Sequence, residues 1–188
     1  LLARLGRADP ALLRPIHHRS EGVQRDRALL RVRDQLVRAR SGLVTQARGL
    51  AKALGTRRPR CDAQRFARHI DRAQLRDAFP GFSALLDAVT ALSQQIAALD
   101  AAITAVARAA YPVTAQLQQV RGVGPITALA YVLTIEEPRR FARGRDVGAY
   151  IGLRPKRYQS GASDPALGIS KAGDPFLRRT LVQAAQYI

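Results

Sequence analysis

The sequence of 188 residues contains no methionine, no tryptophan and only one cysteine, Cys61. A single cysteine cannot form an intrachain disulfide and cannot supply the thiolates of a structural zinc site. This cysteine content fits a reducing, cytoplasmic compartment. Because no methionine is present to initiate translation, we expect these residues to be a fragment of a longer protein.

Histidine is equally scarce, and His17, His18 and His69 all lie in the first half of the chain. The serine of a Ser-His-Asp hydrolase needs a histidine base, and no histidine stands near the serines of the second half. The three histidines lack the spacing of metal ligands, and the carboxylates are too scattered to suit two-metal chemistry. The sequence therefore argues against a hydrolase triad and predicts no metal site within these residues.

Long hydrophobic runs are the third absence. No stretch approaches the length of an apolar helix that crosses a bilayer, and no signal peptide is visible at the start of the sequence. We therefore expect no membrane-spanning segment and no membrane partner.

Positive charge is present in large excess. The formal net charge is +17 and comes mostly from arginine, whose guanidinium group pairs with phosphates better than the lysine ammonium group does. Residues 1–80 carry 19 basic and 7 acidic side chains, residues 81–118 carry 1 and 2, and residues 119–188 carry 11 and 5. Such a charge would repel itself in a compact domain without an anionic partner. Charge alone makes nucleic acid the first candidate partner and an acidic membrane surface the second, and of these two we predict nucleic acid.

Two long helical patterns occupy residues 21–111, after a linker over residues 1–20. The first has Ser20 as its N-cap and stops at Gly55, and the second covers residues 85–110. The apolar seams are Leu29, Val32, Leu36, Ala39, Leu43, Leu50 and Ala53 in the first helix, and Leu85, Val89, Leu92, Ile96, Leu99, Ile103, Val106 and Ala110 in the second. These heptad seams predict an antiparallel coiled-coil hairpin or a dimerisation arm, with ordinary core packing as the alternative.

A glycine turn opens the second region, residues 112–188, which is also mostly helical. Gly122 and Gly124 lie in the string VRGVGPI between two predicted helices, and Pro125 suits the first turn of the second helix. In a helix-hairpin-helix element, such glycines let the backbone approach a DNA phosphate at which the helix amides point. An ordinary turn between helices is the alternative.

The stretch RPKRYQSGASDPALGISKAGD, residues 154–174, is basic and rich in glycine and hydroxyl groups. Its cations are Arg154, Lys156, Arg157 and Lys171. Cationic side chains can stabilise the charge that develops when a serine attacks a phosphodiester. The stretch is therefore either a solvated connecting loop or a phosphate-binding loop that carries a nucleophile.

Two serines of this stretch compete for the role of nucleophile. Ser170 lies just before the last predicted helix, so Ser170 and Asp174 can serve simply as a cap or a turn. Ser160, between Gln159 and Gly161, has no such structural role in view. The chemistry of the stretch alone does not choose between them.

Three strings of the second half resemble a known family: VRGVGPITALAYVLTI, RFARGRDVGAYIGLRPKRYQSG and GISKAGDPFLRRTLVQAA. They resemble the C-terminal transposase domain of the bacterial insertion-sequence family numbered one hundred and ten, relatives of the Piv-type DNA invertases. The upstream string DPALLRPIHHRSEGVQRDRALLRVRDQLVRARSGLV resembles the linker and coiled-coil region of that family. The resemblance covers essentially the whole chain.

The resemblance implies a DNA recombinase with three parts. An N-terminal nuclease-like domain of the Holliday-junction-resolvase (RuvC) type carries acidic magnesium ligands, a helical arm supports homo-oligomers, and a C-terminal domain supplies a serine nucleophile. The serine that matches this nucleophile is Ser160. A structured non-coding RNA is implied as a guide. The nuclease-like domain is not within these residues, so we expect no cofactor here, magnesium in that missing domain, and no recombination by the fragment alone.

The sequence therefore predicts a mainly α fold: a coiled-coil helical hairpin over residues 21–111, then a small helical domain over residues 112–188, incomplete at its C-terminus. In the intact transposase, Ser160 would attack a DNA phosphate. The residues expected to bind DNA or its phosphates are Gly122, Gly124, Arg154, Lys156, Arg157 and Lys171. A non-catalytic nucleic-acid-binding module and a coiled-coil dimerisation module are the alternatives.

Overall fold

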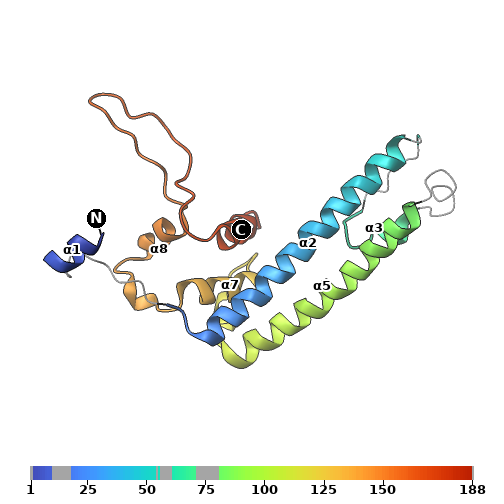
Figure 1. Cartoon of the computed structure of the whole chain (residues 1–188), viewed down its shortest axis with the longest axis horizontal. Coiled ribbons are helices and arrows are strands. Elements are labelled where there is room, and N and C mark those ends of the chain that lie inside the picture. Colours follow the sequence, from blue (N-terminus) through green and yellow to red (C-terminus); the bar gives the residue numbers. More distant parts are fainter. Residues whose placement is uncertain (1, 10–17, 54, 56–60, 71–80, 188) are drawn as a thin grey trace.

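The computed structural model describes residues 2–9, 18–53, 55, 61–70 and 81–187 (Figure 1). These residues are mainly helical, and the described part contains no strand, only two isolated β-bridges. The prediction of a mainly α fold is confirmed. The helices are α1 (Leu2–Ala8), α2 (Glu21–Ala53), α3 (Phe66–His69), α5 (Phe82–Ala110), α6 (Thr114–Leu117), α7 (Pro125–Ile135), the 3₁₀ helix η2 (Pro138–Arg140), α8 (Gly144–Ile151) and α9 (Pro175–Ala185).

The predicted start signals act as expected. The Ser20 hydroxyl accepts a hydrogen bond from the Val23 amide at 3.4 Å, so Ser20 is the N-cap of α2. Pro125 and Pro175 stand in the first turns of α7 and α9, where the missing amide hydrogen of proline costs no hydrogen bond. Local sequence therefore sets where three of the main helices begin.

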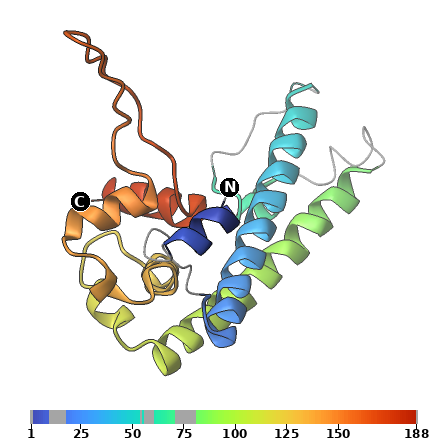
Figure 2. The same cartoon turned by 60° about the vertical axis from the view of Figure 1, so that its left-hand side comes forward.

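The two long helices α2 and α5 lie side by side and run in opposite directions (Figures 1 and 2). Of the eight residues in the predicted seam of α5, all but the exposed Ala110 are buried or partly buried, and Val89, Ile96 and Ile103 are the buried ones. On α2 the leucine seam is only half-buried, and the buried stripe lies one residue further along the chain. The fully buried apolar residues of α2 are Leu30, Val44, Ala47 and Ala51. Whether this pair is a coiled coil that joins two copies of the chain stays a prediction.

Polar side chains at seven-residue intervals on α2 explain this shift. Arg33 donates from Nε and Nη2 to the two carboxylate oxygens of Asp100 on α5, at 2.8 and 3.3 Å. Arg40 donates to the Ser93 hydroxyl at 3.3 Å. One heptad before Arg33, the buried Asp26 accepts a hydrogen bond of 2.8 Å from the Tyr111 hydroxyl. Polar groups in a helical seam fix the register, because any slip would leave them unpaired.

Two clusters of buried apolar side chains hold the fold together. One lies towards the end of the hairpin where α3 packs, and it includes Val44, Phe66, Phe82 and Leu86. The other joins both long helices to the C-terminal helices, and it includes Leu30, Ile103, Ala107, Leu129, Leu133, Ile151 and Leu177. The second cluster therefore spans the predicted domain boundary at residue 112. That boundary stays a prediction.

The expectation that no stretch could span a membrane by length and composition was wrong for α5. Phe82–Ala110 is long and apolar enough to pass that test. The sequence reading missed it because Asp87, Asp100 and Arg108 break the apolar run into shorter pieces. Length and composition alone do not separate a membrane span from a core helix, and one face of α5 packs against α2.

The position of the buried stripe on α2 can be tested with a matched pair of valines. Val44 is 2% exposed and Val32 is 52% exposed. Val44→Ala should lower the free energy of unfolding by about 2 kcal/mol, because it removes buried methyl groups and leaves a cavity. Val32→Ala should change it by less than about 0.5 kcal/mol. Urea unfolding followed by circular dichroism checks both, and equal losses would place the buried stripe elsewhere.

The Tyr111–Asp26 contact makes a prediction about pH. Burial, and then the hydrogen bond to Asp26, raise the pKa of Tyr111 to about 12 from an ordinary value of 10.0. Because the folded state holds this proton more tightly, the stabilisation is complete below about pH 10 and is lost as the pH rises through 12. The stability difference between the natural protein and Tyr111→Phe should therefore shrink above pH 10. Tyr158→Phe, at a side chain that is 74% exposed, is the control and should show no such trend.

Candidate nucleic-acid interface

Residues 153–170 form a long extended hairpin, here called the arm, which projects from the helical body (Figures 1 and 2). Its two sides are joined by backbone hydrogen bonds from Ser170 to Arg154 at 2.8 Å and from Lys156 to Gly168 at 3.0 Å. Ser160 and Ser163 exchange two backbone hydrogen bonds of 3.0 Å at the far end. Ser160 therefore stands at the tip of the arm. It is exposed, and no hydrogen bond of its hydroxyl group is found within the described residues.

The root of the arm is locked by two glycines with positive φ, Gly152 at 81° and Gly173 at 72°. A Cβ atom at Gly152 would overlap the Ala172 backbone, and one at Gly173 would overlap the Tyr150 carbonyl. Arg178 then donates from Nη1 to the carbonyls of Ile151 at 2.9 Å and Ala172 at 2.7 Å. The arm is thus fixed at its root, although most of its length is exposed to solvent.

The four predicted phosphate-binding cations are spread along the arm rather than gathered at Ser160. Arg154 and Lys171 stand at the root, and the Lys171 amide donates to the Gly152 carbonyl at 3.0 Å. With about 3.3 Å per extended residue, Arg154 lies roughly 20 Å from Ser160. Arg157 is nearer to the tip, where it pairs with Asp164 at 3.3 Å in an exposed contact. These cations cannot all contact one phosphate.

Ser170 and Asp174 have the structural roles that were expected of them. Asp174 is the N-cap of α9, where its Oδ1 accepts hydrogen bonds from the amides of Phe176 at 2.9 Å and Leu177 at 3.1 Å. Ser170 accepts a long hydrogen bond of 3.5 Å from the Ala172 amide. Asp174 is therefore the cap, and Ser170 belongs to the turn before it.

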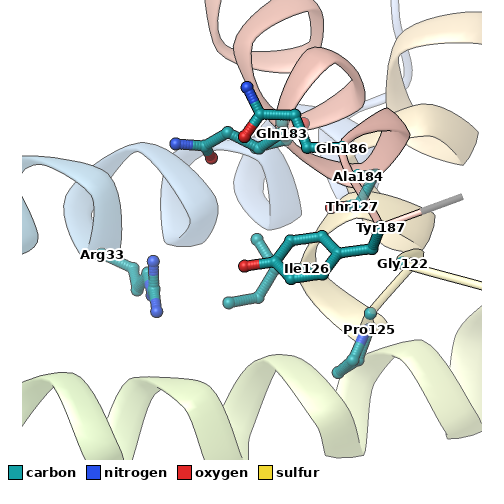
Figure 3. Close-up of a pocket in the computed structure, with 11 residues that line it drawn as sticks. Arg33, Gly122, Pro125, Ile126, Thr127, Gln183, Ala184, Gln186 and Tyr187 are labelled. Carbon is teal, nitrogen blue, oxygen red and sulfur yellow. The ribbon is translucent and has the colours of Figure 1, made fainter.

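The glycine turn borders a groove of about 490 Å³ between the start of α7, helix α9 and Arg33 of α2 (Figure 3). Gly122 has φ at 85°, and a Cβ atom there would overlap the Ala184 carbonyl of α9. Gly122 is thus required by the packing of α9. Gly124, by contrast, has open space around its Cα and precedes the free amides of the first turn of α7.

The cations beside this groove already have acidic partners. Arg33 binds Asp100, and Arg179 pairs with Asp34 on α2. Tyr187 and Gln183 also line the groove, and Figure 3 shows the Tyr187 ring directed towards the Arg33 side. The groove is therefore less cationic than the sequence indicates, and the helix-hairpin-helix assignment stays a prediction.

Sequence reasoning missed a cluster at Tyr150. The Tyr150 hydroxyl accepts a hydrogen bond from Arg19 Nη2 at 3.3 Å, and the Arg140 guanidinium group lies 4.4 Å from the Tyr150 ring centroid. Burial opposes ionisation of Tyr150, but hydrogen bonds and charge from Arg140 and Arg19 outweigh it, so the pKa is lowered overall. The basic string PRRFARGR was the available signal, but Arg19 is more than one hundred residues away in the sequence.

A metal centre finds no support within the described part of the chain. It contains no group of three or more His, Cys, Asp or Glu side chains that could hold a metal ion. Magnesium therefore does not fit these residues, and no chemical step here is assigned to one.

The region that contains the arm is similar to a known protein family. Residues 114–188 match the family model described as "Transposase IS116/IS110/IS902 family". The matched segment contains the glycine turn, the arm and the last helix, so these features form one family region.

Similarity to individual transposases extends over most of the chain. This chain is 31% identical over 186 residues to the transposase for insertion sequence element IS1111A of Coxiella burnetii. The aligned region covers 95% of this chain and 50% of that protein. This chain is 35% identical over 188 residues to the transposase for insertion sequence element IS1328 of Yersinia enterocolitica, covering 94% and 54%. A probable family 20 transposase of Pseudomonas aeruginosa is 31% identical, covering 94% and 54%. The chain spans about half the length of these relatives.

The packing at the root of the arm can be tested with a matched pair of glycines. Gly152→Ala should lower the free energy of unfolding by about 3 kcal/mol, because the new methyl group adds an overlap with the Ala172 backbone to the cost of positive φ. Gly161 at the tip has φ at 57° and open space around it. Gly161→Ala should cost only about 1 kcal/mol. Urea unfolding of both variants checks this, and similar costs would show that the root is not tightly packed.

Proposed function

We propose that this chain is part of a DNA transposase in which Ser160 is the nucleophile for strand cleavage and exchange. The observation that carries the proposal is the place of Ser160 at the exposed tip of a rooted, basic arm within the transposase-family segment. A nucleophile that attacks a phosphate of a DNA strand must be exposed to solvent and held on a fixed support. The arm provides these two properties.

The proposed step is a transfer of one phosphodiester linkage. The Ser160 Oγ atom loses its proton to water and forms a bond to phosphorus, while the bond from phosphorus to one deoxyribose oxygen breaks. The leaving oxygen takes up a proton, and the other strand end stays linked to Ser160 as a phosphoserine ester. Arg157, near the tip, is placed to stabilise the charge on this phosphate once it releases Asp164.

The other cations of the arm have a different role in this proposal. Lys156, Arg154 and Lys171 are exposed and, in that order, lie progressively nearer to the root. They would contact phosphates further along the same strand, and such contacts position DNA without reading its sequence. Gly124 and the start of α7 would add a further backbone contact.

The wider family properties belong to the same proposal. We expect the intact protein to use a structured RNA guide and to form homo-oligomers through the long helices of residues 21–111. We also expect it to hold magnesium with acidic residues outside this chain. A binding module without catalysis is the second candidate. It is favoured by the Ser160 hydroxyl, which has no base or other hydrogen-bond partner among the described residues.

The test is Ser160→Ala in the full-length protein, with its element DNA and RNA, in a strand-exchange assay. We expect exchange to fall by at least about 100-fold, because no nucleophile remains to form the ester. Ser163→Ala is the matched control, since Ser163 sits opposite Ser160 in the same turn and should keep exchange near the natural level. Ser170→Ala tests the competing serine.

Binding must be measured beside exchange to separate the two candidates. Ser160→Ala should keep the natural DNA affinity and its steep loss with salt, because the phosphate contacts remain. Unchanged strand exchange in Ser160→Ala would leave the binding module as the function. A shallow salt dependence in the natural protein would count against binding through phosphates.

A further inference from the structure

Arg19, which is far away in the sequence, meets residues 134–150 around Tyr150 at the root of the arm. Arg19, just before α2, donates to the Tyr150 hydroxyl at 3.3 Å and to the Thr134 carbonyl at 3.4 Å. Arg140 of η2 stacks on the rings of Tyr150, at 4.4 Å, and Phe141, at 4.7 Å. The two rings meet edge to face at 5.4 Å. The result is a fixed arrangement of two arginines around one phenol.

Two guanidinium nitrogens beside Tyr150 are buried without a hydrogen-bond partner, Arg19 Nε and Arg27 Nη1. Glu136 approaches Arg19 Nε at 3.9 Å, which is an ion pair but too long for a hydrogen bond. A buried donor without a partner costs free energy, and more so when it is charged. These unfilled donors indicate a missing acceptor.

The charges around the site favour an anion. Burial, and then the nearby positive charge of Arg19, lower the pKa of Arg27, while Asp174 opposes this shift. The charged groups that act on Tyr150, Arg19 or Arg27 are the cations Arg19, Arg27, Arg31 and Arg140 and the anions Glu136 and Asp174. The positive groups outnumber the negative ones, so an added anion would relieve repulsion between the guanidinium groups.

The backbone at Glu136 is strained in the same place. Glu136 has φ at 58° and ψ at −69°, an unusual conformation for a residue with a side chain. Such strain costs free energy and often marks a functional site. Here it holds the end of α7 and the Glu136 carboxylate against Arg19.

We propose that Arg19, Arg140 and the Tyr150 hydroxyl form a binding site for one phosphate group, separate from the tip of the arm. Two guanidinium groups and a hydroxyl can each donate to a phosphate oxygen, and Arg27 adds positive charge behind them. The same short segment of the chain carries the exposed arginines Arg139, Arg143 and Arg145, and this local excess of positive charge favours a phosphate of a nucleic acid strand. Only this choice of source rests on the proposed function, and the site itself does not.

The test compares Arg140→Gln with Arg139→Gln, which removes the same charge from the adjacent residue. Inorganic phosphate is titrated into the 188-residue chain at constant ionic strength, with chloride in exchange, and thermal unfolding is followed. We expect phosphate to stabilise the natural protein and Arg139→Gln alike. Arg140→Gln should bind phosphate about tenfold or more weakly, since it loses a charge-assisted hydrogen bond. Equal affinities in the two variants, or no phosphate effect in the natural protein, would overturn the proposal.

Two further measurements separate a loss of phosphate binding from a loss of folding. Tyr150→Phe keeps the ring beneath Arg140 but removes the hydroxyl group, so it should fold normally and still weaken phosphate binding. The Arg19 Nε–H resonance should shift in NMR spectra when inorganic phosphate binds, and an unmoved resonance would contradict the assigned donor.

The source of the phosphate is decided with a labelled single-stranded 12-nucleotide DNA. If Arg140→Gln weakens its binding much more than Arg139→Gln does, and inorganic phosphate competes, the site holds a strand phosphate. If only inorganic phosphate binding changes, the site holds free phosphate. Ser160→Ala should leave both measurements unchanged, so failure of the serine mechanism and failure of this site are distinguishable.

Discussion

The carboxylate of Asp174 is the point on which the C-terminal part of the structure depends. One oxygen caps α9 through the amides of Phe176 and Leu177, and the other accepts a hydrogen bond of 2.6 Å from Arg27 on α2. Both partners of this ion pair are largely buried. The Asp174 side chain therefore connects helix α2 to helix α9 and to the root of the arm. Removing one partner would leave a buried charge alone, which is far costlier than losing a surface pair.

Much of the fold could be predicted because its signals are local. Ser20, Pro125 and Pro175 mark helix starts through their own backbone chemistry, and the apolar period of α5 correctly places Val89, Ile96 and Ile103 inside. The stripe of α2 was placed one residue off. Leucines draw attention as seam residues, but the partners of Arg33 and Asp26 on the other helix decide which face turns inward. Such pairing between distant residues has no local signature.

The candidate site was less predictable for the same reason. Ser160 and the basic residues of the arm could be picked out from composition and family resemblance, but their separation along an extended arm could not. That geometry depends on close backbone contact between Gly152 and Ala172, which only the folded chain shows. The Tyr150 cluster was missed because Arg19 and Arg140 meet only through the packing of α2 against α7. Phosphate binding at Gly122 stays a prediction, and the close packing of Gly122 against α9 is a requirement for glycine that the sequence did not show.

The arm places the proposed anchoring and the proposed chemistry at opposite ends of one extended hairpin, whose root is held by close contacts of Gly152 and Gly173. From root to tip it spans roughly 25 Å, about seven times the 3.4 Å rise per nucleotide along the axis of a DNA duplex. Arg154 lies near the root, and Lys156 and Arg157 lie at intermediate positions along this length. A strand phosphate held at Tyr150 would therefore fix which later phosphate reaches Ser160. The locked root then has a functional reason, because a hinge there would lose this spacing, and a nucleophile works only where its target phosphate is held in place.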